Sequence, residues 1–179
     1  MSFTFNWPRF SDQFHYDAIQ MLNTALNKGN KPPIIADRIE VVDRAAMKVI
    51  ATWQVTTARS NFPMALDEAN HRLFIGCRRP AKVLVFDTSN GKQIGAFDIV
   101  GDTDDLFYDA ARKRVYITGG EGYVDVVEDQ GGNHFTRVAH MPTASGARTS
   151  FFVADQSRLY LAVPHRGNQK AEIRIFEAH

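Results

Sequence analysis

Hydrophobic and polar residues follow two different patterns along this chain. Between residues 11 and 28, apolar side chains recur at the three- and four-residue spacing of one helical face. After Lys31-Pro32-Pro33 this spacing ends, and short runs of β-branched and aromatic residues alternate with turn residues up to the C-terminus. We therefore predict one N-terminal amphipathic α-helix and a Pro-rich linker over residues 1–37, followed by an all-β body over residues 38–179.

The all-β body repeats itself. Residues 64–77 align with residues 106–119 without a gap, so that Asp67 falls on Asp109. A third copy surrounds Tyr160, and successive copies lie 42 to 46 residues apart. Each copy predicts four strands, A to D, joined by tight turns. A period of roughly 40 to 50 residues is typical of β-propellers, so we predict four-stranded antiparallel propeller blades.

The number of strands leaves this propeller incomplete. The pattern predicts about 13 strands, namely two in residues 38–55, then four, four and three. The first two resemble strands C and D of a blade, and the last blade stops after strand C at Phe176. These are three and a fraction blades, whereas a ring closes with at least roughly four. Residues 49–55 could complete the last blade, within one chain or in a homodimer of about six blades.

One resemblance supports the propeller. Residues 82–97, KVLVFDTSNGKQIGAF, and residues 115–119, VYITG, resemble the bacterial YVTN-type (YncE-like) propeller repeat, whose units read YVTN, then VSVIDT, then TGK. The resemblance covers roughly residues 38–179, and residues 116–119 differ from the signature at two positions. It implies a propeller with a binding or scaffolding role. Such proteins are mostly exported in bacteria, whereas this sequence begins without a signal peptide.

A second resemblance covers residues 1–41. The sequence FNW at residues 5–7, the residues before Gly29 and the sequence KPPIIADRI from residue 31 are similar to the start of an SMP lipid-transfer domain. That domain belongs to a fungal mitochondrial distribution and morphology protein of the ERMES tether between endoplasmic reticulum and mitochondrion. A whole SMP domain needs a longer chain, so lipid transfer is not carried over. The resemblance implies an alternative function, a contact-site protein at the mitochondrial outer membrane that binds lipid or partner subunits.

Composition excludes several other classes of protein. The 179 residues include 21 Lys and Arg against 20 Asp and Glu, so no overall field attracts nucleic acid, and we expect no nucleic-acid partner. A single cysteine, Cys77, excludes an intramolecular disulfide and a multi-thiolate zinc site. No stretch approaches the roughly 18 apolar residues of a membrane span, and the N-terminus lacks a secretory signal. We expect an intracellular protein, with a membrane partner only under the contact-site alternative.

The loops that join D to A and B to C share one rim of a propeller, and this rim holds the candidate binding residues. Their side chains differ from blade to blade, which a binding face and ordinary loops both permit. Four arginines of the rim, Arg59, Arg79, Arg148 and Arg166, could hold an anion or could simply form surface salt bridges. The predicted binding residues for a protein or small polar ligand are Arg59, Asn61, Arg79, Asp104, Asp105, Glu121, Arg148, His165 and Arg166.

Acidic residues on the same rim raise the question of a metal. Asp102, Asp104 and Glu121 could supply hard oxygen ligands to a divalent cation, as in sugar-lactonase propellers. A metal-dependent, lactonase-like hydrolase is therefore a second alternative function. The competing interpretation is that these carboxylates cap turns in solvent.

No catalytic residues are predicted. The sequence has no nucleophile elbow, no Ser-His-Asp arrangement and no HExxH motif, and its six histidines lack metal-ligand spacing. No cofactor is predicted, and the leading hypothesis is a non-catalytic binding or scaffold protein. Seven further residues stand out in the repeat pattern and are expected to have structural roles. They are the buried thiol Cys77, the turn caps Asp67, Asp109 and Asp155, and the aromatic residues between blades, Phe74, Tyr116 and Tyr160.

Overall fold

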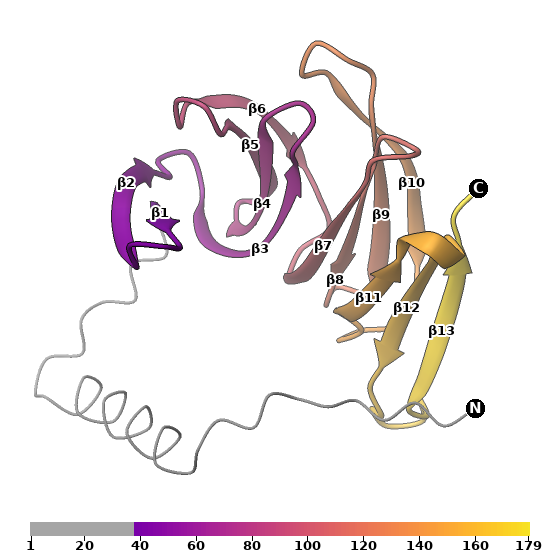
Figure 1. The fold of residues 1–179 in the computed structure, drawn as a ribbon. Helices are drawn as coiled ribbons and strands as arrows, with labels where there is room; N and C mark the ends of the chain where they lie inside the picture. The colour runs from indigo at the N-terminus through magenta and orange to yellow at the C-terminus, as the bar shows by residue number, and fades with distance from the viewer. Residues whose placement is uncertain (1–37) are drawn as a thin grey trace, which may run out of the picture. The chain divides into compact units, whose positions relative to one another are not determined.

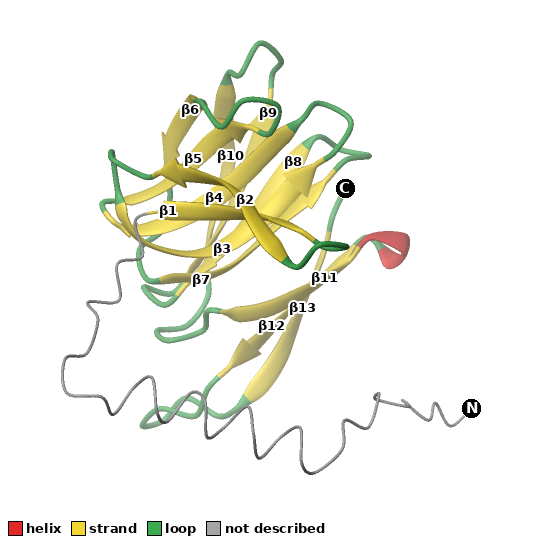
Figure 2. Cartoon of the chain, turned by 60° about the vertical axis from the view of Figure 1, so that its left-hand side comes forward, coloured by secondary structure: helices red, strands yellow, loops and turns green. Residues whose placement is uncertain are grey.

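The computed structural model describes residues 38–179, so the helix predicted in residues 11–28 lies outside the described part. The described residues form strands β1 to β13 and one short 3₁₀ helix, Ala154–Gln156 (Figures 1 and 2). The strands form sheets of two, four, four and three, all with antiparallel pairing. Within the described residues this confirms the all-β prediction and its strand count.

The sheets follow one another in chain order (Figure 1). A hairpin comes first, made of β1 (Arg38–Asp43) and β2 (Lys48–Gln54). Blade 1 consists of β3 (Arg59–Asp67), β4 (Arg72–Arg79), β5 (Ala81–Asp87) and β6 (Gln93–Asp98). Blade 2 consists of β7 (Thr103–Asp109), β8 (Arg114–Gly119), β9 (Tyr123–Asp129) and β10 (Phe135–Pro142). The last sheet consists of β11 (Thr149–Val153), β12 (Arg158–Val163) and β13 (Glu172–Glu177).

Alternation of side chains puts a buried apolar layer on each side of a blade. In blade 1, Ile75 faces the β1–β2 hairpin, and its neighbour Phe74 faces blade 2. In blade 2, Ile117 faces blade 1, and Tyr116 faces the last sheet. Phe74 and Tyr116 are 0% and 4% exposed, which confirms that both pack between blades. Tyr160 is only half-buried, because no described sheet follows the last one.

Aspartates cap two of the turns between strands A and B, as predicted. The Asp67 carboxylate accepts a hydrogen bond from the backbone N–H of Asn70 at 3.3 Å. The Asp109 carboxylate accepts one from the N–H of Ala111 at 3.1 Å. The prediction for Asp155 is wrong, because this residue lies exposed in the 3₁₀ helix, past the end of β11. The strand register puts Val153, opposite Arg158, at the position that corresponds to Asp67.

The β1–β2 hairpin takes the place of strands C and D in a blade before blade 1. Ile39 and Val55 are buried in the same apolar cluster as Leu73 and Phe86 of blade 1. Trp53 stacks on Phe86 with ring centroids 6.5 Å apart. In the described chain β2 pairs with β1 and not with β13, so the hypothesis that it completes the last sheet within one chain is wrong.

Removal of residues 1–55 should destabilise the chain by about 2 kcal/mol relative to removal of residues 1–37. The longer deletion uncovers Ile75 and Phe86, which are now at most 1% exposed, and exposing one large apolar side chain costs roughly this much. Thermal unfolding of the two truncated chains measures the difference. If they melt at the same temperature, the hairpin does not stabilise blade 1.

Candidate functional site

The predicted rim carries a cluster of four charged side chains contributed by three successive sheets. Asp102 and Asp104 lie at the start of blade 2, Arg78 is the last residue but one of β4 in blade 1, and Arg148 precedes β11. Arg78 pairs with Asp102 at 3.4 Å and also with Asp104. Arg148 pairs with Asp104 at 3.0 Å and also with Asp102. Each carboxylate therefore faces two guanidinium groups, and the cluster is neutral.

Arg78 was missed by the sequence analysis, which selected its neighbour Arg79. Arg78 shares the face of Phe74 and Gly76, so its side chain reaches blade 2 and donates a hydrogen bond to the Thr103 carbonyl at 2.8 Å. Its guanidinium carbon also lies 4.3 Å from the centre of the Phe62 ring. Arg79 is exposed. The two-residue alternation of β4 was the signal that could have distinguished them.

The three acidic residues predicted as metal ligands do not form a common ligand set. The described residues contain no group of three or more His, Cys, Asp or Glu side chains that could hold a metal ion. Glu121 instead accepts a hydrogen bond from the Gly101 N–H at 3.0 Å. Asp102 and Asp104 face arginines, and two adjacent cations disfavour a third.

Other rim residues brace the loops. Asp105 accepts a hydrogen bond from the Ser150 N–H at 2.6 Å, which ties blade 2 to the last sheet. Burial raises the pKa of the Asp105 carboxyl, this hydrogen bond opposes the shift, and the nearby Asp104 charge adds to it. Thr118 donates to the Arg148 carbonyl at 2.6 Å and so fixes the backbone of the charged cluster.

The remaining predicted residues lie outside this cluster. Arg59, Arg79, His165 and Arg166 are exposed. Asn61 is half-buried, and its Oδ1 atom is buried with no hydrogen-bond partner among the described residues. The structure therefore brings together three residues named in the sequence analysis, Asp102, Asp104 and Arg148, and adds Arg78. The other candidates remain predictions.

A buried aspartate near the rim was also missed. The Asp125 side chain is 0% exposed and accepts a hydrogen bond from the Val100 N–H at 2.7 Å. Its other oxygen lies 2.5 Å from Nδ1 of His140, whose ring stacks on Tyr123. Asp125 thus anchors the loop between blades 1 and 2.

Cys77 is buried as predicted, and burial raises the pKa of its thiol to about 11.

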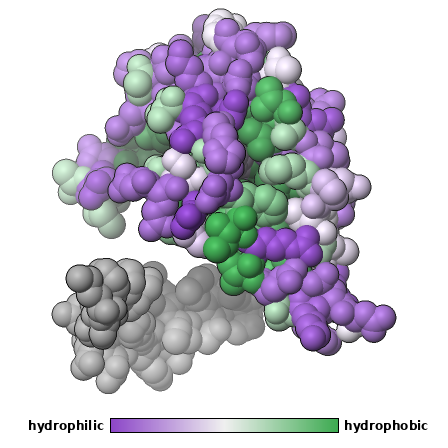
Figure 3. Space-filling view, turned by 90° about the vertical axis from the view of Figure 1, so that its right-hand side faces the viewer, coloured by the Kyte–Doolittle hydropathy of each residue, from purple (hydrophilic) through white to green (hydrophobic). Residues whose placement is uncertain are grey.

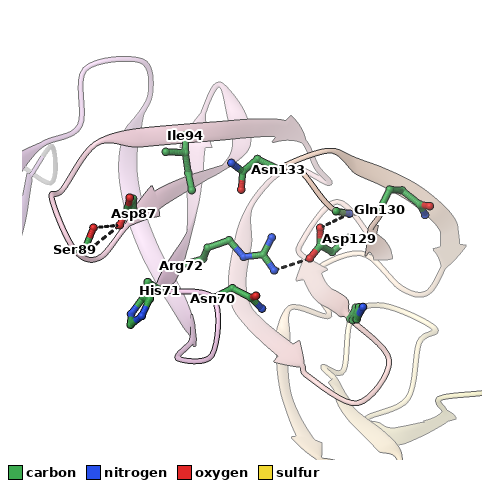
Figure 4. A pocket seen from close by; sticks show the side chains of 12 residues that line it. Asn70, His71, Arg72, Asp87, Ser89, Ile94, Asp129, Gln130 and Asn133 are labelled. Atoms are coloured by element: carbon green, nitrogen blue, oxygen red, sulfur yellow. Dashed lines mark hydrogen bonds and ion pairs between the residues drawn. The ribbon is translucent and has the colours of Figure 1, made fainter.

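A cleft of about 640 Å³ lies at the opposite end of blades 1 and 2, where the A–B and C–D turns meet (Figure 4). None of the predicted site residues lines it, because the prediction considered only the other rim. Figure 4 shows Arg72 in the cleft with its guanidinium directed at Asp129. The residues that line the cleft are mostly polar and comprise Asn70, His71, Arg72, Asp87, Ser89, Ile94, Lys113, Asp129, Gln130, Gly131, Gly132 and Asn133.

The base of the cleft is a buried ion triad. Arg72 donates to Asp67 at 2.6 Å and to Asp129 at 2.5 Å, and all three side chains are at most 7% exposed. Burial, the largest influence, would raise the pKa of both carboxyls. The hydrogen bonds and charge of Arg72, together with hydrogen bonds from Asn70 to Asp67 and from Gly131 to Asp129, outweigh it, and both pKa values are lowered. Burial alone would lower the pKa of Arg72, but the hydrogen bonds and charges of the two carboxylates outweigh burial and raise this pKa above its ordinary value. The triad pairs one cation with two carboxylates, so it carries a net charge of −1 and ties blade 1 to blade 2. The surrounding polar groups line the cleft.

The free energy of unfolding should fall as the pH is lowered below 3.8. This is the ordinary pKa of Asp67 and Asp129, and their folded values lie below it. Their contribution is therefore complete above the unfolded pKa and is lost as the pH falls through the folded pKa. Urea unfolding between about pH 5 and pH 2 measures this loss. The variant Arg72→Met should show a weaker fall, and an equal fall in both proteins would contradict the assignment to the triad.

No described helix is long and apolar enough to span a membrane.

Comparison with known proteins separates the two parts of the chain. Residues 1–49 match the family model described as the Mdm34 N-terminal domain. The chain is 93% identical over 43 residues to mitochondrial distribution and morphology protein 34 of Laccaria bicolor, and 66% identical over 41 residues to that of Mycosarcoma maydis. These stretches span 24% and 23% of this chain but only 11% and 4% of the two relatives.

The β body is similar to several solved structures, one of which is a β-propeller domain. Hydrazine synthase of Kuenenia stuttgartiensis superposes on 79% of this chain with a TM-score of 0.68 and 16% identity. The Cps50 (Swd1) β-propeller domain of Myceliophthora thermophila covers 72% with a TM-score of 0.59 and 12% identity, and Sqt1 of Saccharomyces cerevisiae covers 71% with 0.56 and 12%. This chain spans 40%, 43% and 35% of those three chains. At such identities the similarity establishes a propeller-like fold alone.

Proposed function

We propose that this chain acts at a contact site between the mitochondrial outer membrane and the endoplasmic reticulum, where residues 1–49 bind subunits of an ERMES-type tether. The observation that carries this proposal is the 93% identity over 43 residues to a mitochondrial distribution and morphology protein. The matched stretch covers 11% of that relative, so lipid transfer by the whole domain is not part of the proposal.

The β body serves in this proposal as a non-catalytic scaffold with YVTN-type blades. Two surfaces support a binding role, the charged rim around Arg78 and Arg148 and the polar cleft beside Arg72. The exposed rim residues Arg79 and Arg166 would contact a protein or a small polar ligand. A lactonase-like activity has no comparable support, because Asp102 and Asp104 face guanidinium groups.

Localisation in fungal cells tests the first part of the proposal. The full chain with a C-terminal fluorescent tag should co-purify with mitochondrial outer membranes and with tether subunits. The double variant Phe5→Ala/Trp7→Ala changes two aromatic residues of the matched segment and should lose both properties. The variant Lys92→Glu, in the exposed turn between β5 and β6 and outside the matched segment, is the control and should keep them. A full chain that does not fractionate with mitochondria would overturn the proposal.

Partner capture tests the scaffold role. Proteins bound to the tagged chain are cross-linked to it in cells and recovered with it. The double variant Arg79→Glu/Arg166→Glu reverses two exposed rim charges. It should therefore retain mitochondrial localisation but recover at least several-fold less cross-linked protein than the unchanged chain. Equal recovery by this variant and by Lys92→Glu would show that the rim does not bind.

A further inference from the structure

The two ends of the row of sheets expose apolar side chains at positions that are buried elsewhere in the same fold. The repeats make this comparison direct, because each strand position occurs in more than one sheet. The surfaces concerned are one face of the last sheet and the inner edge of blade 1. In both cases the equivalent residues of the other sheets are covered by a neighbouring sheet.

The first surface, the C-terminal open face, comprises Phe151, Ile173 and Ile175. In the strand register Ile175 lies opposite Tyr160, as Val126 lies opposite Tyr116 and Val85 opposite Phe74. Ile175 is 55% exposed, whereas Val126 and Val85 are 8% and 0% exposed.

The other members of this face show the same contrast. Ile173 is 62% exposed, and its equivalents Val83 and Val124 are fully buried. Phe151 is 64% exposed, while its equivalent Phe107 packs in the cluster between blade 2 and the last sheet. In Figure 3, which views the side where β10 to β13 lie, hydrophobic surface interrupts a largely hydrophilic one.

The second surface, the N-terminal open face, comprises Met64 and Leu66 of β3. Met64 lies opposite Ile75, as Leu106 lies opposite Ile117. Met64 is 55% exposed and Leu66 is 51% exposed, whereas Leu106 is 4% exposed because blade 1 covers it. The β1–β2 hairpin covers the outer part of blade 1 but supplies only strands C and D of the preceding blade.

The two open faces are opposite halves of one kind of interface. Wherever two blades meet in this chain, the face that corresponds to Ile173 and Ile175 packs on the face that corresponds to Met64 and Leu66. Among the described residues no strands A and B precede the β1–β2 hairpin, and β11 and β12 are strands A and B of the last sheet. A single chain thus carries both the surface that needs covering and the strands that would cover it.

We propose that two copies of this chain associate head to tail, with the C-terminal open face of each copy on the N-terminal open face of the other. Each junction becomes a composite blade that takes its inner strands from one copy and its outer strands from the other. Because β1 already fills the third-strand position beside blade 1, where Ile39 is buried, β13 lies outside the four-stranded composite blade. Phe151 of β11 is then the residue of the C-terminal open face that meets Met64.

Two complete blades per copy and two composite blades give a ring of about six, which a two-fold axis closes and which leaves no sheet face open to further addition. This chain spans 43% of the Cps50 (Swd1) β-propeller domain, slightly less than half, as expected if two copies make up one ring.

Light scattering after size exclusion tests this arrangement on the full chain. The mass should be about twice the 20.1 kDa of one chain at micromolar concentration. The variants Phe151→Lys and Met64→Asp should each shift the protein to the monomer, with unchanged circular dichroism because both side chains are already exposed. The control variant Val138→Lys changes an exposed residue of β10, 47% exposed and outside both faces, and should remain dimeric.

Mixing the two monomeric variants tests which face meets which. In a head-to-tail pair, one junction brings the two new and opposite charges together, and the other keeps both native side chains. The mixture should therefore recover dimers. A monomeric wild-type chain, variants that stay dimeric, a mixture that stays monomeric, or oligomers that grow with concentration would each overturn the closed head-to-tail pair.

Discussion

Replacement of Tyr116 by alanine is expected to lower the free energy of unfolding by about 3 to 5 kcal/mol, the range for truncating a buried aromatic side chain. The Tyr116 ring is 4% exposed and lies between blade 2 and the last sheet, with its centroid 4.8 Å from that of Phe152. Its hydroxyl donates a hydrogen bond to Asp109 at 3.1 Å. Burial and the adjacent Asp109 charge raise the pKa of Tyr116 to about 12, so the ring stays neutral.

Urea unfolding of three variants separates the contributions of the Tyr116 ring. Tyr116→Phe keeps the packing and removes only the hydrogen bond to Asp109, so it should cost about 1 kcal/mol. Tyr160→Ala removes the equivalent side chain of the last sheet, which is half-buried, and should cost less than Tyr116→Ala. Equal losses for Tyr116→Ala and Tyr160→Ala would show that packing between blade 2 and the last sheet does not set the stability.

Replacement of Arg72 by methionine is expected to destabilise the chain by about 3 to 5 kcal/mol, because it leaves Asp67 and Asp129 buried without their cation. Methionine retains much of the apolar stem, so the loss reports mainly on charge. The triad also joins strands that are distant in sequence, since Asp67 ends β3 and Asp129 ends β9. Arg72 further lies 5.8 and 5.7 Å from the ring centres of Phe74 and Phe135.

Arg158 provides the matched control for Arg72. It occupies the same register position in the last sheet and pairs with Glu177 at 3.1 Å, but its side chain is 44% exposed. Arg158→Met should therefore leave the urea midpoint nearly unchanged, as expected for an exposed ion pair. The deficit of Arg72→Met should also shrink below the pH at which its two orphaned carboxyls bind protons. A deficit that is constant across this pH range would assign the loss to packing instead.

Much of the fold followed from local pattern. Strands with two-residue alternation, repeated every 42 to 46 residues, were sufficient to place the described strands and to assign Phe74 and Tyr116 to interfaces between blades. The turn cap at Asp155 failed because this residue lies three residues before Arg158, whereas Asp67 and Asp109 lie five residues before Arg72 and Arg114. Asp155 therefore falls inside the turn and not at the end of strand A. The comparison of Val153 with Asp67 required the actual strand pairing.

The candidate site followed from sequence only in part. The acidic loop residues were found, but their partners Arg78 and Arg148 come from the sheets before and after blade 2. The cleft beside Arg72 was not found, because its lining comes from turns of two blades and no local motif marks it.

The sequence by itself determined the periodicity, the strand count and the alternation of faces in this protein, because each depends on residues close together in the chain. Tertiary structure alone decided that Arg78 of blade 1 meets Asp102 and Asp104 of blade 2, and that β2 pairs with β1 and not with β13. It also decided that Met64 and Ile175 are exposed where their equivalents are buried. The physical reason is that charge pairing and burial depend on which sheets pack against each other, and the same strand pattern is compatible with a covered or an open face.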